Sequence, residues 1–204
     1  MTSAHGRGTR AVAAAGLAAL ALLAGAWQQP TPATPQGRLD VSLPQRYTTL
    51  AADLNAFSGA TSGVIEIVIS RWSTDAEQSQ LMSALAEKGP DEMLKVLKKQ
   101  KPVGRLRTPG SIGQELQFSS QQPSRSGGRD IILLTDRIID YTEFAGMARS
   151  VEYPFLYIEL HLDAKSQGKG SLLPAAKLIP AGRLLVAENY NMVPISLGSV
   201  KREK

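Results

Sequence analysis

The part of the chain that most constrains the fold runs from Val103 to the end, where apolar or alternating segments are separated by turn residues. These segments predict β-strands over residues 103–108, 112–119, 130–135, 153–163, 171–178, 183–188 and 195–200. Successive strands that are joined by short turns pair antiparallel. The sequence therefore predicts a mainly antiparallel sheet, curled into a barrel or folded into a sandwich.

A pair of helices is predicted near residues 75–100, ahead of these strands. Thr74 and Glu77 have the spacing of a capping box, which satisfies free backbone N–H groups at a helix start. Gly89 is placed to end the first helix and Pro90 to begin the second. Strand and helix do not alternate repeatedly along the chain. The predicted class is therefore α+β with one inserted helical hairpin, not a parallel doubly wound fold.

The first 26 residues have the three parts of a secretory signal peptide. Arg7 and Arg10 precede an uncharged run of 16 residues that ends in the small residues of a cleavage site at Ala26. A transmembrane helix needs about 20 apolar residues, so cleavage of this segment is favoured over its retention as a membrane anchor. A contact with the membrane is expected only if the segment stays uncleaved. The sequence predicts a bacterial protein that is exported to the periplasm or the exterior.

Behind the signal peptide, the sequence predicts a disordered leader over residues 27–40 and a single domain over residues 41–204. Pro, Gln and Thr dominate the leader, and this composition favours an extended chain. The rest is long enough to bury a core of its own. Within it, residues 46–57 fit either a strand or a short helix, residues 64–70 fit a buried strand, and residues 121–129 predict a polar loop.

The residue types that are missing exclude several kinds of chemistry. The chain has no cysteine, and His161 is the one histidine beyond the signal peptide. Disulfides, thiol nucleophiles, thiolate zinc sites and three-histidine zinc sites are therefore excluded. Neither GxxxxGK[ST] nor GxGxxG occurs, so no phosphate loop is predicted. We expect no metal site and no cofactor.

The charge of the chain is modest. Removal of Arg7 and Arg10 with the signal peptide leaves 21 of the 23 basic residues against 18 acids, a net charge of +3. One dense basic stretch contains Lys95, Lys98, Lys99, Lys101, Arg105 and Arg107. It fits a solvated helix end and strand face, or contact with an anionic surface. No aromatic residue interrupts it, and with an exported location this argues against a nucleic-acid partner.

The long strand over residues 153–163 carries the candidate catalytic residues. Its alternation sends Leu156, Ile158, Leu160 and Leu162 to one face, and Phe155, Tyr157, Glu159, His161 and Asp163 to the other. His161 would act as a general base, with Glu159 or Asp163 stabilising its charged form. The same pattern also fits the polar outer face of a half-exposed strand, because no GxSxG nucleophile motif accompanies it.

Two groups of residues are candidates for ligand binding. Arg71 and Trp72 follow the buried strand 64–70, and this pair of residue types is favoured in binding hot spots. The alternative places Trp72 in the core and pairs Arg71 with a nearby acid. Tyr153, Phe155 and Tyr157 are the second group, and they either rim a pocket or close one end of a barrel.

Three stretches, RWSTDAE within residues 63–77, PGSIG within 107–113 and YPFLYIELHLD at 153–163, resemble an uncharacterised family of exported bacterial proteins. The resemblance implies a signal peptide followed by one small domain, and it supplies no active site. Our leading hypothesis is therefore non-enzymatic binding of a small molecule or an envelope protein. The alternatives are a hydrolase that uses His161 with Glu159 or Asp163, and a structural component of the envelope.

Overall fold

The computed structural model describes residues 39–52, 62–124, 127–136, 153–181, 184–189 and 193–203. The predicted signal peptide and the leader up to residue 38 lie outside these residues. The strands are β1 (Gln45–Ala52), β2 (Ser62–Ile69), β3 (Gly104–Arg107), β4 (Gln114–Leu116), β5 (Phe118–Pro123), β6 (Arg129–Asp136), β7 (Phe155–Leu162), β8 (Gln167–Ala181), β9 (Leu184–Asn189) and β10 (Ile195–Arg202). The helices are α2 (Asp75–Lys88) and α3 (Pro90–Lys99).

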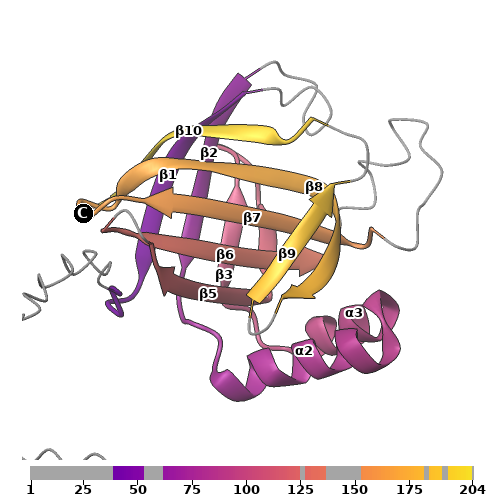
Figure 1. Cartoon of the computed structure of the whole chain (residues 1–204). Coiled ribbons are helices and arrows are strands. Elements are labelled where there is room, and N and C mark those ends of the chain that lie inside the picture. Colours follow the sequence, from indigo (N-terminus) through magenta and orange to yellow (C-terminus); the bar gives the residue numbers. More distant parts are fainter. Residues whose placement is uncertain are drawn as a thin grey trace, which may run out of the picture. The chain divides into compact units, whose positions relative to one another are not determined.

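The ten strands form one antiparallel sheet in the order β4-β3-β2-β1-β10-β8-β7-β6-β5, with β9 paired to β8 (Figure 1). The predicted α+β class is confirmed. The sheet is not closed by a ladder between its end strands, β4 and β5. These two strands are nevertheless consecutive in the chain, and Gln117 between them donates its backbone N–H to the Leu134 carbonyl on β6 at 3.0 Å.

The strand predicted over residues 112–119 is two strands in the structure, β4 and β5, because the chain changes its partner strand at Gln117. Its first part pairs with β3, and the part after Gln117 pairs with β6. The segment that fitted either a strand or a short helix forms β1, because β2 and β10 supply hydrogen-bonding partners on both of its edges. Both the division of residues 112–119 and the formation of β1 depend on pairing between strands that are distant in the sequence, and a local pattern cannot reveal such pairing.

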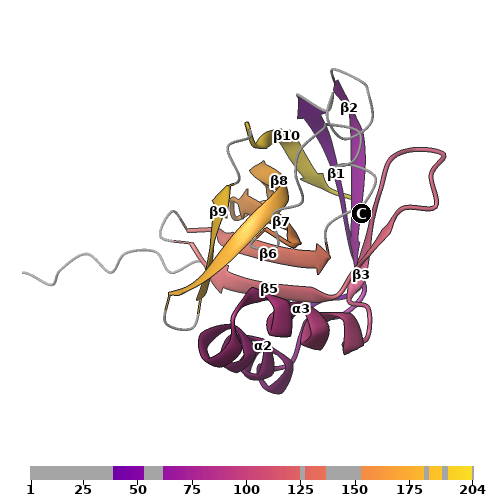
Figure 2. The ribbon, with the colours of Figure 1, turned by 90° about the vertical axis from the view of Figure 1, so that its right-hand side faces the viewer.

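Two cores lie on opposite faces of the sheet. The first gathers inward side chains from β1, β2, β3, β4, β6, β7, β8 and β10, so the sheet curls around it. The second lies between the outer face and the helical hairpin, which covers that face beside β5 (Figure 2). Alternation along β6 sends Ile131 and Leu133 to the first core and Ile132 and Leu134 to the second.

The predicted capping box at the start of α2 is present. Thr74 Oγ1 accepts from the Glu77 backbone N–H at 3.2 Å, and the Glu77 carboxylate accepts from the Thr74 N–H at 2.8 Å. Gly89 separates the helices with φ of 83°, a left-handed conformation that favours glycine. Among the described residues, neither helix is long and apolar enough to cross a membrane.

Candidate functional site

A pocket of about 630 Å³ lies at the end of the sheet where β6 begins and β7 ends. Its walls come from residues 39–42 ahead of β1, from Gly127 and Gly128 ahead of β6, and from the turn that contains Asp163 and Ser166 between β7 and β8. The ladders bring these segments together, because Arg129 on β6 lies opposite Leu162 on β7. We call this site the Arg129 pocket.

Arg129 is a buried cation in the wall of this pocket, with 2% of its side chain exposed. A guanidinium has five N–H donors and no acceptor, so burial requires acceptors around it. Its terminal nitrogens donate, within 3.3 Å, to the Asp40 carbonyl and Gln121 Oε1 from Nη1, and to Tyr47 Oη, Gln45 Oε1 and Ser166 Oγ from Nη2. All of these acceptors are uncharged, so the charge needs a separate partner.

That partner is Asp40. Its Oδ2 lies 3.7 Å from Arg129 Nη1 and also contacts Arg202 Nη1. Hydrogen bonds from Ser42, together with the nearby Arg202 guanidinium, lower the pKa of Asp40 to about 2, against desolvation, which raises it. Asp40 is therefore ionised at neutral pH, and one carboxylate serves two guanidinium groups.

The strand pattern explains why polar groups point into this end of the sheet. Alternation along β1 turns Gln45, Tyr47, Thr49 and Ala51 inward, and the first two lie nearest the pocket. Burial raises the pKa of the Tyr47 hydroxyl, which stays protonated and donates to Gln45 Oε1 at 2.6 Å. On β6, Arg129 falls in the same alternation as Ile131 and Leu133, so its side chain points to the same inner face of the sheet as theirs.

Gly128 permits the close approach that places Arg129. A Cβ atom at this position would lie 1.8 Å from the Leu162 carbonyl oxygen on β7. Any side chain would force the start of β6 away from β7. The absence of a side chain at residue 128 therefore sets the position of the guanidinium.

The structure brings His161 and Glu159 together and adds Asp130, which sequence reasoning missed. His161 Nδ1 lies 2.9 Å from Asp130 Oδ1, and Nε2 lies 3.7 Å from Glu159 Oε1. Asp130 and His161 are opposite each other in the β6–β7 ladder. Asp163 Oδ1 instead accepts the backbone N–H groups of Lys165 and Gln167, which stabilises the turn after β7. Both ring nitrogens of His161 therefore lie near a carboxylate, Nδ1 beside Asp130 and Nε2 beside Glu159.

The aromatic candidates lie mostly in the second core. Phe155 and Tyr157 are buried there, beneath the helices and β9. Desolvation raises the pKa of Tyr157 well above its usual value, and Glu159 adds to the effect. Tyr153, just ahead of β7, is half-buried. Phe155, Tyr157, Glu159 and His161 do share the outer face, as predicted, but the helical hairpin covers the first part of it.

Arg71 and Trp72 connect the sheet to the helices. Arg71 forms a bidentate ion pair with Glu77 at 2.8 and 2.9 Å, and it also donates to the carbonyl groups of Lys101 and Pro102 beyond α3. Trp72 packs against the first core, and its buried Nε1 has no hydrogen-bond partner in the described part of the chain. Arg71 thus holds the start of α2 to the segment that follows α3.

Acid should weaken this Arg71–Glu77 contact. The Arg71 hydrogen bonds are the largest cause that lowers the pKa of Glu77 to about 2, and the Thr74 N–H adds to it. A lowered pKa stabilises the fold above the ordinary carboxyl value near 4.5, and this contribution disappears as the pH falls towards 2. Between pH 6 and pH 2.5, we expect the free energy of unfolding to fall by about 2 kcal/mol more in the wild type than in Glu77→Gln.

Denaturant unfolding at several pH values measures this difference. Glu92→Gln is the matched control, because Glu92 lies on an exposed helical surface and pairs with Lys95. It should keep most of the pH dependence of the wild type, because Lys95 lowers the pKa of Glu92 only through an exposed pair that solvent screens. Equal pH dependence in Glu77→Gln and the wild type would show that Glu77 does not stabilise the fold through its charge.

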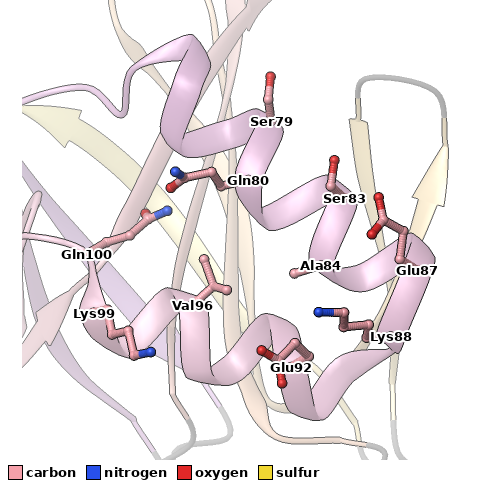
Figure 3. A pocket seen from close by; sticks show the side chains of 10 residues that line it. All are labelled: Ser79, Gln80, Ser83, Ala84, Glu87, Lys88, Glu92, Val96, Lys99 and Gln100. Atoms are coloured by element: carbon pink, nitrogen blue, oxygen red, sulfur yellow. The ribbon is translucent and has the colours of Figure 1, made fainter.

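A second pocket, of about 590 Å³, lies between α2 and α3 (Figure 3). Ala84 and Val96 lie between the two helices, and the charged side chains along the pocket are Glu87, Lys88, Glu92 and Lys99 (Figure 3). Charges of both signs alternate there, and Glu92 is engaged with Lys95 at 3.1 Å. This mixture favours a solvated surface over a site for one class of ligand.

No family model, curated protein or solved structure matches this chain. The functional argument therefore rests on the geometry of the sites. Sequence reasoning singled out neither Arg129 nor Asp40, the charged pair of the Arg129 pocket. The available signal was the strand alternation, which places Arg129 on the same face as the apolar residues Ile131 and Leu133.

Proposed function

We propose that this protein is an exported domain that binds a small amphipathic molecule in the Arg129 pocket and catalyses no reaction. The observation that carries the proposal is a buried guanidinium in the wall of a pocket of about 630 Å³. Ligand sites typically combine an apolar lining with a few fixed polar groups. The predicted signal peptide supports a site that works in the periplasm or outside the cell.

The polar part of the pocket is held in place before any ligand arrives. Arg129 is bound by acceptors from several segments of the chain, and Gln45 and Tyr47 beside it are buried. Such a fixed donor loses little conformational freedom when a ligand binds. A buried ion pair is also a costly way to fill the end of a sheet, since replacing both of its members by apolar residues of similar volume is often neutral for stability. Ligand recognition supplies a reason to keep the charge.

The apolar part of the pocket comes from the segment ahead of β1. Leu39 and Val41 line the pocket and are 42% and 75% exposed. Ala164 adds a small apolar group from the turn between β7 and β8. A ligand with a polar head and a short apolar body would cover these side chains while its head reached the polar wall.

A thermal-shift screen of the purified protein against fatty acids, phospholipids, sugars, peptides and metal ions tests this proposal. A ligand at 100 times its dissociation constant stabilises the fold by about 2.7 kcal/mol. Val41→Asp should weaken binding of an amphipathic hit at least tenfold, because it places a charge on the apolar wall. Val193→Asp is the matched control, since Val193 is also 75% exposed but does not line the pocket. A flat screen, or equal effects of the two variants, would contradict the proposal.

The hydrolase hypothesis remains the second candidate, and the 2.9 Å contact between His161 Nδ1 and Asp130 favours it. An acid that orients a histidine is one part of a catalytic relay. This hypothesis predicts that His161→Ala abolishes a hydrolytic activity while the melting temperature changes little, since the side chain is 48% exposed. Loss of stability without loss of an activity would rule it out.

A further inference from the structure

We infer that the Arg129 pocket recognises a carboxylate, and that the side chain of Asp40 occupies this carboxylate site within the same chain. A ligand carboxylate would take the place of the Asp40 side chain between Arg129 and Arg202, while Leu39 and Val41 stay in the apolar wall. The inference rests on the proposed function and names the chemistry of the ligand head.

The side chain of Asp40 is bound as a ligand carboxylate would be. Two guanidinium groups from different strands meet at its Oδ2, Arg129 from β6 and Arg202 from β10. Its Oδ1 accepts from the backbone N–H of Ser42 at 2.9 Å and from Ser42 Oγ at 2.6 Å. Arginine is the side chain best suited to carboxylates, because its planar fork presents paired donors.

The backbone carbonyl of Asp40 is surrounded as closely as its carboxylate. Three donors reach this oxygen: Gln121 Nε2 at 2.9 Å, Gln45 Nε2 at 3.0 Å and Arg129 Nη1 at 3.2 Å. A carbonyl oxygen has two lone pairs, so this wall offers more donors than one oxygen needs. The site therefore suits a ligand that carries a carboxylate and a second oxygen acceptor close to it.

The remaining charge at the pocket does not oppose an incoming anion strongly. Asp163 also lines the pocket, but its Oδ1 accepts two backbone N–H groups within its own turn. When the Asp40 side chain turns away, the buried Arg129 keeps its hydrogen bonds to Tyr47 and Gln45 but loses its counter-ion. An unpaired buried charge is strongly unfavourable, and this drives an external carboxylate into the site.

Chemical rescue of Asp40→Ala by sodium acetate tests the inference. We expect this variant to melt below the wild type and to regain melting temperature with acetate in a saturable manner, beyond the effect of equal sodium chloride. Asp163→Ala is the matched control, because it removes the other carboxylate that lines the pocket. It should respond to acetate and chloride alike. If Asp40→Ala does not fold, Asp40→Asn keeps the shape and removes the charge.

The outcomes separate this inference from the proposed function. Equal responses of the Asp40 variant to acetate and chloride would overturn the carboxylate site. A screening hit without a carboxylate, bound equally by wild type and Asp40→Ala, would also overturn it while leaving the proposed function intact. Acetate rescue together with a flat screen would retain the carboxylate site and reject the proposed function. A carboxylate hit that binds Asp40→Ala at least tenfold tighter than wild type would support both.

Discussion

Replacement of Arg129 by methionine is expected to lower the free energy of unfolding by about 3 kcal/mol. The substitution removes the donor shared by Gln45, Tyr47 and the Asp40 carbonyl, all near the buried guanidinium. Each buried polar group that loses its partner costs about 1–3 kcal/mol, and the apolar replacement recovers part of the total. Denaturant unfolding at neutral pH gives the difference between variant and wild type.

Arg202→Met is the matched control for this measurement. Arg202 contacts the same Asp40 carboxylate, but its side chain is 26% exposed and solvent can replace its contacts. We expect a loss within about 1 kcal/mol, as for ion pairs near the surface. If Arg129→Met were as stable as Arg202→Met, the hydrogen bonds around Arg129 would not hold this end of the sheet together.

The second large effect is expected at Phe155, where alanine should cost about 3–5 kcal/mol. The ring is fully buried in the second core, between the outer face of the sheet and the helices. Its removal leaves a cavity that the surrounding side chains fill only in part. Thermal or denaturant unfolding measures the loss.

Ile112→Ala provides the comparison for Phe155→Ala, because Ile112 is 86% exposed in the segment between β3 and β4. Truncation there should change stability by less than about 0.5 kcal/mol. A Phe155→Ala variant that kept its stability but lost binding of a screening hit would place Phe155 in a ligand site and contradict its position in the core.

The long strand β7 shows how far local pattern predicts this fold. The alternation of Leu156 to Leu162 correctly assigns one face to the interior, because the period of a strand is a property of the backbone itself. The same pattern did not distinguish Phe155 from His161 on the other face. Whether that face is covered depends on where the helical hairpin packs, and this is decided by contacts distant in sequence.

The Arg129 pocket was not predictable for a related reason. Composition places Asp40 in the predicted leader, yet Asp40 contacts Arg129 and, 162 residues further along the chain, Arg202. No spacing rule connects residues so far apart. The capping box of Thr74 and Glu77 was predictable, because its partners are three residues apart and the geometry of one helical turn brings them together.

Two-dimensional NMR of the purified protein, titrated with a screening hit, tests the central claim most directly. Ligand binding in the Arg129 pocket should shift the backbone amide signals of Gly127, Gly128, Asp163 and Ser166, which line it. The signals of Ser83 and Lys99, which line the pocket between α2 and α3, should stay in place. Saturable shifts confined to the helical pocket, with the first group unchanged, would contradict our assignment of the binding site.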